Sequence, residues 1–253
     1  MKKINPLIGL ILSLPCANVS ASDTIEAETH QRYYNEALNL SPNLDNGRKL
    51  YRYCITCHGP EGWGTINGAY PQIAGQLKNV IIKQLDDIRQ GNRDNPIMRA
   101  FTSPRILPDS QSIADVAGYI SALPMTPHNG IAPIANLENG KRIYDRDCVD
   151  CHGDQGQGDI KEIIPSVHGQ HFNYLLRQFT WIRDGRRKNA DKKMARQIRN
   201  FTGQEQHDVL AYTATLRPPA DKLASEGWEN PDFKNFDRRW QPGAGYKRRS
   251  WKD

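Results

Sequence analysis

A five-residue pattern that occurs twice constrains this chain more than any other feature. It reads Cys54-Ile55-Thr56-Cys57-His58 in the first half and Cys148-Val149-Asp150-Cys151-His152 in the second. In the pattern C-x-x-C-H, two sulfurs on one helical turn can each form a thioether to a c-type haem, and the histidine that follows can bind the iron. A thioredoxin-like redox pair or half of a zinc site are the alternatives for a single match. The histidine recurs both times, and no other cysteine lies nearby to complete a zinc site. The pattern therefore predicts two covalently attached haems, each with its iron.

Length and composition agree with two small haem domains. The chain has 253 residues, of which only 38% are hydrophobic. That is a lean composition for two cores made of protein alone, since small domains bury a smaller fraction of their surface. A haem in each domain supplies a large apolar plate for the side chains to surround.

The first residues have the pattern of a secretory signal. Lys2 and Lys3 precede a short apolar run at 7–14, and small residues end at Ala21, where we expect cleavage. The run is too short to span a bilayer as an anchor. Cys16, the one cysteine outside the motifs, is expected to leave with residues 1–21. We therefore expect a periplasmic protein, and an exported haem protein is a poor candidate for a nucleic-acid partner.

The two motifs lie within an internal repeat with a period near 94 residues, which indicates a duplicated domain. Pro71 and Pro165 each follow the motif histidine by thirteen residues. Further matches are Gly75-Gln76 with Gly169-Gln170, Gln84 with Gln178, Gly91 with Gly185, and Asp115-Val116 with Asp208-Val209. The predicted organisation is a lead-in at 22–43, a first domain at 44–124, a linker at 125–134, a second domain at 135–217 and an extension at 218–253.

Each copy is predicted to be all-α. Apolar spacing and stop signals indicate a helix from about Asp45 that carries the motif cysteines, a helix over about 80–89, and a last helix over about 110–123, with its partner over 203–216. The linker is rich in Pro and Gly. The lead-in is expected either to form a helix lying on the first domain or to be partly disordered.

Met98 and Met194 are the candidates for the second axial ligand of each iron. They follow the motif histidines by forty and forty-two residues, in the polar loop before each last helix. A methionine thioether is a common sixth ligand in haem electron carriers, whereas most methionines only fill cores. The matched positions favour ligation here. Met125 lies beyond the third helix, and we expect it to pack in the linker.

His168 and His171 compete for the second iron, because they fall where the first copy has no histidine. A bis-histidine haem would have a lower reduction potential. His168 follows Pro165 so closely that it should remain on the side of His152. We therefore expect both histidines to be partly exposed or to hydrogen-bond a haem propionate.

Over residues 44–217 the chain resembles the diheme class I cytochromes of the cytochrome c4 family. The shared features are the tandem motifs, the Pro-x-x-x-Gly-Gln segments, the Gln-Leu-x-x-x-Arg-x-Gly helix end at 84–91 and the methionine in each loop. The resemblance implies two tandem class I cytochrome c domains with His/Met ligation: His58 and Met98 on the first iron, His152 and Met194 on the second. It also implies that Pro71 and Pro165 accept hydrogen bonds from the histidine rings, and that Gly47 and Gly140 allow close helix crossings.

The chain departs from the family pattern in three places. One extra residue separates Tyr144 from Cys148, so the first helix of the second copy is expected to be distorted. Met98 and Met194 stand alone where the family has a methionine cluster. The extension at 218–253 exceeds the family fold.

Two classes of function remain open. An iron with two protein ligands has no open position, which favours an electron carrier between respiratory redox proteins. The alternative is a diheme enzyme, or the electron-accepting subunit of a dehydrogenase such as thiosulfate dehydrogenase. The carrier is favoured because every mature cysteine is used for haem attachment, so none is left as a thiolate ligand.

Charge suggests the kind of partner. Basic residues crowd the loop around Met194, with Asp184 and Asp191 opposing them: Arg183, Arg186, Arg187, Lys188, Lys192, Lys193, Arg196 and Arg199. They form either a solvated face or a docking face for an acidic reductase, oxidase or dehydrogenase.

The extension combines aromatic and basic residues. Its aromatic residues are expected to anchor it on the cytochrome surface, and its basic end to remain exposed to an acidic partner or an anionic membrane surface. They are Trp228, Phe233, Phe236, Trp240, Tyr246 and Trp251.

Overall fold

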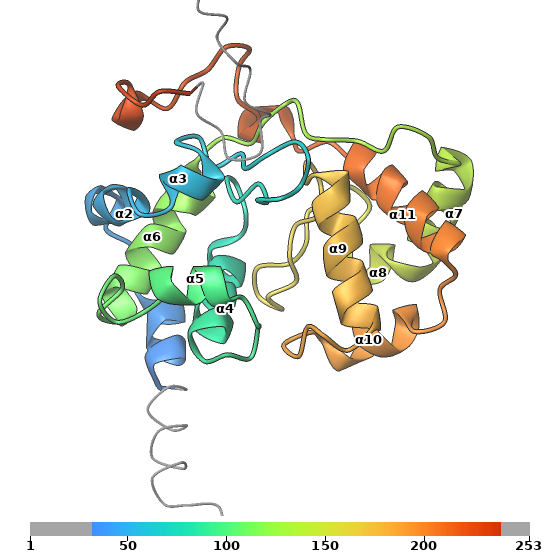
Figure 1. Cartoon of the computed structure of the whole chain (residues 1–253), viewed down its shortest axis with the longest axis horizontal. Helices are drawn as coiled ribbons and strands as arrows, with labels where there is room; N and C mark the ends of the chain where they lie inside the picture. Colours follow the sequence, from blue (N-terminus) through green and yellow to red (C-terminus); the bar gives the residue numbers. More distant parts are fainter. Residues whose placement is uncertain (1–31, 239–253) are drawn as a thin grey trace, which may run out of the picture.

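The computed structural model describes residues 32–238, which form two helical domains side by side (Figure 1). The first contains α2 (Leu44–Tyr51), α3 (Ile55–His58), α4 (Lys78–Arg89), α5 (Pro96–Phe101) and α6 (Ser110–Ala122). The second contains α7 (Leu137–Asp147), α8 (Val149–His152), α9 (Phe172–Arg183), α10 (Lys192–Ile198) and α11 (Gly203–Thr215). Two 3-10 helices follow, η1 (Ala220–Lys222) and η2 (Pro231–Phe233). Between residues 32 and 238 no strand forms, only isolated bridges, so the all-α prediction is confirmed.

Side-chain caps define where the helices begin. The carboxylate of Asp109 accepts from the backbone N–H of Ser112 and starts α6, while Thr202 and Glu205 form a reciprocal capping box that starts α11. Both helices end close to a proline, Pro124 or Pro218, which cannot continue a helix. The predicted helices at 80–89, 110–123 and 203–216 therefore correspond to α4, α6 and α11.

Each domain is built on one close crossing of its first and last helices. A Cβ atom on Gly47 would lie 2.2 Å from the carbonyl oxygen of Asp115 in α6, and a Cβ on Gly140 would lie 2.1 Å from that of Asp208 in α11. Only glycine permits this approach. The two aspartates are 1% exposed and accept hydrogen bonds from the start of the crossing helix. The crossings implied by the family resemblance are present in both domains.

The extra residue between Tyr144 and Cys148 does not distort the second domain. The backbone N–H of Cys148 donates to the carbonyl of Tyr144 at 2.9 Å, which continues the helical i to i+4 pattern, and α7 runs to Asp147. In the first domain the N–H of Cys54 donates to Tyr51 at 2.8 Å, only three residues back. The expectation of a distorted first helix in the second copy was therefore wrong. The tightened turn lies in the shorter first copy instead, where α2 ends.

The lead-in lies on the first domain as far as the structure describes it. Residues 32–39 are helical, and Ala37 is fully buried in the first hydrophobic cluster. Ser110 at the start of α6 donates to the carboxylate of Glu36 at 2.8 Å. Residues 1–31, with the expected signal, lie outside the described residues. Among the described helices, none is long and apolar enough to cross a membrane.

The linker is packed between the domains. Met125 is 4% exposed, and its side chain fills the space beside Gly75 of the first domain and Gly169 of the second. The amide of Asn129 donates to the carbonyls of Gln170 and Ala214. The expectation that Met125 packs rather than binds iron agrees with this position.

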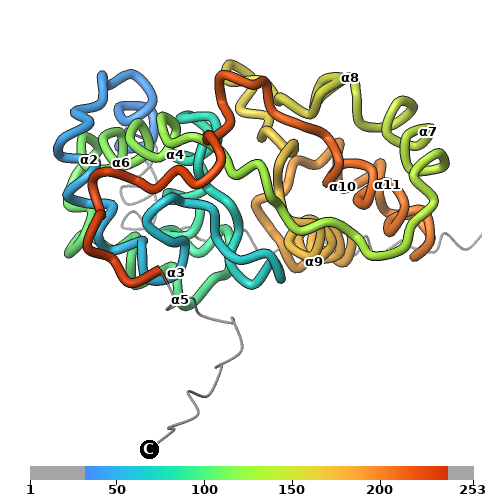
Figure 2. Tube along the Cα trace, turned by 90° about the horizontal axis from the view of Figure 1, so that it is seen from above, coloured from blue at the N-terminus to red at the C-terminus, as the bar shows by residue number. Residues whose placement is uncertain are grey.

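After α11 the chain turns back and crosses the first domain as a strap, residues 217–238, which Figure 2 shows in red. It pairs with the linker, where the backbone of Met125 exchanges hydrogen bonds of 2.8 Å with Lys222 and Ala224. Phe233 is 8% exposed and belongs to the first hydrophobic cluster, and Trp228 and Phe236 pack against that cluster. The predicted anchoring is confirmed for these three aromatic residues. Trp240, Tyr246 and Trp251 lie outside the described residues.

Candidate haem sites

Each C-x-x-C-H motif folds into a single helical turn, α3 or α8. The backbone N–H of His58 donates to the carbonyl of Cys54 at 3.0 Å, and His152 donates to Cys148 at 2.9 Å. Gly59 and Gly153 then end the turns with φ of 76° and 79°, a conformation that favours glycine. Two sulfurs and an imidazole thus leave the backbone from one turn, as covalent haem attachment requires.

The ring of each motif histidine is fixed by a backbone carbonyl. Nδ1 of His58 lies 3.0 Å from the carbonyl oxygen of Pro71, and Nδ1 of His152 lies 3.0 Å from that of Pro165. A carbonyl can only accept, so Nδ1 holds the proton and Nε2 of the neutral ring keeps its lone pair for a metal. Burial lowers the pKa of both histidines, more than the proline carbonyls raise it, and so favours the neutral ring. Both contacts implied by the resemblance are present.

The proline loops approach the motifs closely because of glycine. A Cβ on Gly64 would lie 2.3 Å from the carbonyl oxygen of Tyr70 and 2.4 Å from that of Pro71. A Cβ on Gly158 would lie 2.4 Å from the carbonyl oxygen of Ile164, next to Pro165. These glycines let the chain return to the histidine within one short loop.

The first cysteine of each motif does not have the properties of a reactive thiolate. Burial is the main cause that raises the pKa of Cys54 to about 12 and that of Cys148 to about 12. Reactive redox cysteines have a lowered pKa instead. Over the described residues 32–238, no group of three His, Cys, Asp or Glu side chains is arranged to hold a metal ion. The thioredoxin-like and zinc alternatives therefore lack support.

Met98 and Met194 occupy equivalent places in the two domains, but in short helices rather than in loops. Asn95 caps α5 by accepting from the N–H of Met98 at 3.2 Å, and Asp191 caps α10 by accepting from that of Met194 at 2.9 Å. Met194 packs against the second hydrophobic cluster. The sequence missed these helices because each has only six or seven residues, too few for a visible period.

His168 and His171 are buried, so the expectation that they are partly exposed was wrong, while the hydrogen bond to a haem propionate stays a prediction. They are 2% and 1% exposed, and the ring of His171 lies between the domains, where it contacts Trp63 of the first. Nδ1 of His168 lies 3.0 Å from the carbonyl oxygen of Gln155. In His171, Nδ1 accepts from the N–H of Gly130 at 3.0 Å and Nε2 donates to the carbonyl oxygen of Trp63 at 2.7 Å. Both ring nitrogens of His171 are used, which leaves none for an iron.

The repeat analysis missed a polar interface between the domains. The guanidinium of Arg93 donates to Gln84 of its own domain and to Gln178 of the other, and Arg187 donates to the same two side-chain oxygens. Burial and the neighbouring Arg93 lower the pKa of Arg187 to about 10. Arg93 and Arg187 are 94 residues apart, which is the period of the repeat. Their matching positions in the two copies were the signal in the sequence that could have indicated this interface. Two half-buried guanidiniums suit carboxylates such as haem propionates.

Comparison with known proteins decides the family. The sequence model of the Cytochrome c family matches twice, at residues 44–124 and 137–217. The chain belongs to the cytochrome c family. It is 31% identical to the thiosulfate dehydrogenase electron acceptor of Stutzerimonas stutzeri strain A1501, over 71% of this chain and 90% of that protein. It is 32% identical to cytochrome c4 of Pseudomonas aeruginosa, over 60% of this chain and 77% of that protein.

A solved structure shows the same fold. The crystal structure of reduced cytochrome c4 from Pseudomonas stutzeri superposes with a TM-score of 0.57 at 24% identity, covering 70% of this chain and all of that one. The cytochrome is therefore a diheme member of the cytochrome c4 family. Its two domains and the paired cysteines Cys54, Cys57, Cys148 and Cys151 fit two covalently bound haems.

Proposed function

We propose that this diheme cytochrome is a periplasmic carrier that passes single electrons between respiratory redox proteins through two His/Met-ligated haems. The observation that supports it most is the matched geometry: in both domains the motif histidine has its ring fixed with Nε2 available, and a methionine lies at an equivalent helix start. Bound haem supplies one-electron chemistry at each iron.

In this proposal the ligands are His58 and Met98 in the first domain and His152 and Met194 in the second. Ligands on both faces leave no position for a substrate, so each iron only gains or loses one electron. Arg93 and Arg187 supply positive charge that would stabilise the propionates. The periplasmic location rests on the signal pattern at residues 1–21 and on the chemistry of haem attachment.

A second candidate is the electron-accepting partner of a thiosulfate dehydrogenase, because a relative with that name matches over most of its length. The chemistry at the irons is then the same, and only the electron donor changes. A catalytic haem, in contrast, needs an open or easily displaced ligand.

The docking face we propose is the exposed basic surface around α10, formed by Arg186, Lys188, Lys192, Lys193, Arg196 and Arg199. Arg187 does not belong to it, since it is half-buried and hydrogen-bonded between the domains, and Arg183 contacts Gln206 and Asp184. A basic surface attracts an acidic partner and accelerates its association at low salt. A membrane-bound reductase, a terminal oxidase or a dehydrogenase with an acidic face would fit.

Carbon monoxide binding tests the carrier against the enzyme. With both irons six-coordinate, reduced protein at neutral pH is expected to bind carbon monoxide slowly and incompletely. Rapid stoichiometric binding at one haem, or reduction by thiosulfate alone at enzymatic rates, would show a catalytic haem and contradict the carrier. Reduction by thiosulfate only when a thiosulfate dehydrogenase is added would support the second candidate.

A further inference from the structure

Two loops with the same sequence pattern meet face to face between the domains. They are residues 71–76 and 165–170, the Pro-x-x-x-Gly-Gln segments, and each begins with the proline whose carbonyl holds the motif histidine of its own domain. Each ends with a glutamine, Gln76 or Gln170. The side-chain oxygen of each glutamine accepts from the N–H of the next residue, Leu77 or His171, at 3.0 Å. Both side chains also reach into the other domain.

The contacts of the two glutamines are reciprocal. Gln170 accepts from the backbone N–H of Gln72 at 3.1 Å and donates to the carbonyl of Gln72 at 2.8 Å. Gln76 accepts from the backbone N–H of Ser166 at 3.0 Å and donates to the carbonyl of Ser166 at 2.9 Å. Each glutamine therefore makes two hydrogen bonds to the backbone of one residue in the other domain. That residue, Gln72 or Ser166, directly follows the proline of its own loop.

That backbone N–H belongs to the same peptide unit as the carbonyl that the histidine bonds. The Pro71 carbonyl and the Gln72 N–H form one planar amide, so His58, this amide and Gln170 are joined in one chain of hydrogen bonds. His152, the amide between Pro165 and Ser166, and Gln76 form the second chain. When an amide donates through its N–H, its carbonyl becomes a stronger acceptor, and low surrounding polarity strengthens the effect.

We propose that Gln76 and Gln170 are positioning residues that act across the interface, each setting the electron-donating strength of the axial histidine in the other domain. The inference rests on the proposed ligation of iron by His58 and His152. A stronger bond from Nδ1 to the proline carbonyl makes the imidazole a better donor, which stabilises Fe(III) and lowers the reduction potential. Each domain thus lowers the potential of the haem in its neighbour.

The two chains of hydrogen bonds are not equally shielded from water. Gln170 is 8% exposed and Gln72 is 3% exposed, whereas Gln76 is half-buried. Water competes less for the bond that serves the first haem. The effect of Gln170 on the first haem is therefore the larger of the two.

The test replaces each glutamine with leucine in the full haem protein and follows a redox titration by NMR, with separate signals for the two haems. In Gln170→Leu the first haem is expected to become easier to reduce, its Fe(II) to Fe(III) ratio at fixed applied potential rising roughly two- to fivefold, the effect of one hydrogen bond. The second haem keeps its potential. In Gln76→Leu the second haem shifts in the same direction by less, and the first does not.

Gln72→Leu is the matched control. Its side chain bonds the carbonyl of Gly169 at 2.6 Å and the N–H of Thr126 at 2.7 Å, so the variant removes interface contacts but leaves the amide that serves His58. Both potentials should stay as in the wild type. As a second measurement, the Nδ1–H proton signal of His58 in reduced protein should move upfield in Gln170→Leu only.

Equal shifts of both haems in either glutamine variant, or no shift of the haem in the opposite domain, would overturn the proposal and leave the glutamines as interface contacts. If Gln170→Leu does not fold, Gln76→Leu decides alone. Failure of the ligation itself is recognised separately: ring signals of His58 and His152 in oxidised wild-type protein would then lack the large paramagnetic shifts of iron ligands.

Discussion

The two domains place the same haem motif in different surroundings. In the first domain Pro60 and Glu61 are buried and Trp63 is half-buried, because the strap lies over them. The residues 94 positions later, at 154, 155 and 157, are Asp, Gln and Gln, and all three are exposed. His58 is 6% exposed, whereas His152 is half-buried.

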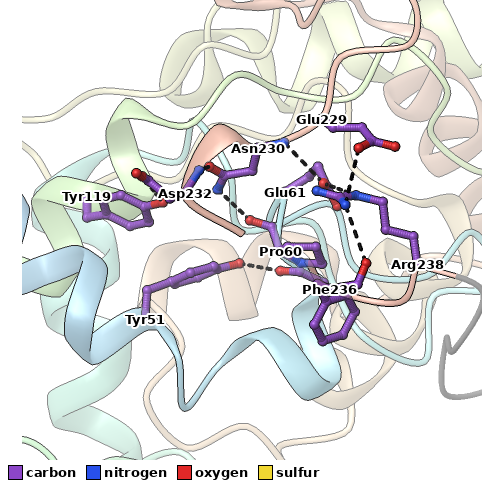
Figure 3. Close-up of polar contacts among 10 residues, drawn as sticks. Tyr51, Pro60, Glu61, Tyr119, Glu229, Asn230, Asp232, Phe236 and Arg238 are labelled. Carbon is purple, nitrogen blue, oxygen red and sulfur yellow. Dashed lines mark hydrogen bonds and ion pairs between the residues drawn. The ribbon is translucent and has the colours of Figure 1, made fainter. Parts of the chain in front are cut away.

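The contacts of the strap explain this difference (Figure 3). The amide of Asn230 donates to the carbonyl of Pro60 at 2.7 Å, and Arg238 forms an ion pair of 2.8 Å with Glu61. Trp228 lies against Trp63 with ring centroids 5.9 Å apart. A cavity of about 260 Å³ between the strap and α3 is lined in part by Cys57, so the strap lies directly beside the haem-attachment turn.

The two copies of the domain thus keep the same motif geometry, while the strap reduces the exposure of the first motif only. The burial of a haem and its access to solvent both change its reduction potential. The exposed residues beside the second motif are consistent with the docking face proposed above for that domain. The basic surface around α10 belongs to this uncovered domain.

Removing the strap is expected to have the largest effect. Truncation after Arg217 exposes the core around Phe233, whose loss alone costs about 3–5 kcal/mol, so the first domain should lose on the order of 5 kcal/mol of stability. Hydrogen exchange read separately in α6 and α11 measures this.

Truncation after Arg238 keeps the whole strap and is the matched control. It should leave hydrogen exchange in α6 as in the full chain. Fast exchange in α11 after truncation at Arg217, with α6 still protected, would contradict the expectation that the strap stabilises the first domain.

Substitutions at the two close helix crossings test the framework that the domains share. Gly47→Ala and Gly140→Ala each force a Cβ against a backbone carbonyl, at 2.2 Å and 2.1 Å before any shift. Each variant should lose about 3 kcal/mol of stability in its own domain, as overpacking does. Urea unfolding of the two variants measures the loss. If alanine is tolerated in one domain only, the two frameworks are not equivalent.

Part of what the two domains share could be predicted from the sequence. The motifs, the repeat and the helix stops at Pro124 and Pro218 located the two domains, because covalent chemistry and helix geometry leave local marks. The path of the strap could not be predicted, since its aromatic residues have no helical period and their partners are distant in the sequence: Phe233 contacts Tyr51, and Trp228 contacts Trp63. The position of Arg187 between the domains was missed for a related reason: its side chain is polar, and its hydrogen-bond partners Gln84 and Gln178 come from different domains.

Charge at the second domain should govern association. A double variant, Lys192→Glu with Lys193→Glu, is expected to slow electron transfer from an acidic donor such as reduced flavodoxin roughly tenfold at low ionic strength. The difference should disappear at high salt, where exposed charges are screened. Stopped-flow measurement gives the rate constants. Lys49→Glu, an exposed change on the first domain, is the control, and an equal effect there would argue against a defined docking face.

The smallest effect concerns a single hydroxyl. Tyr119 donates to Asp232 at 2.9 Å and accepts from Asn230 at 3.1 Å, both in the strap, whereas no strap residue up to 238 hydrogen-bonds the hydroxyl of its counterpart Tyr212. Tyr119→Phe should cost about 1 kcal/mol in the first domain, and Tyr212→Phe close to nothing. Thermal unfolding compares the two. Equal losses would show that strap contacts do not distinguish the domains.

In the function proposed above, both irons have the same His/Met ligation although their surroundings differ. The absorption spectrum of air-oxidised protein tests it directly, through the weak long-wavelength band that reports a methionine–iron bond. Met98→Ala and Met194→Ala should each remove one half of that band, and the double variant all of it. If Met194→Ala leaves the band intact while His168→Ala perturbs the second haem, the ligation proposed for the second domain is wrong.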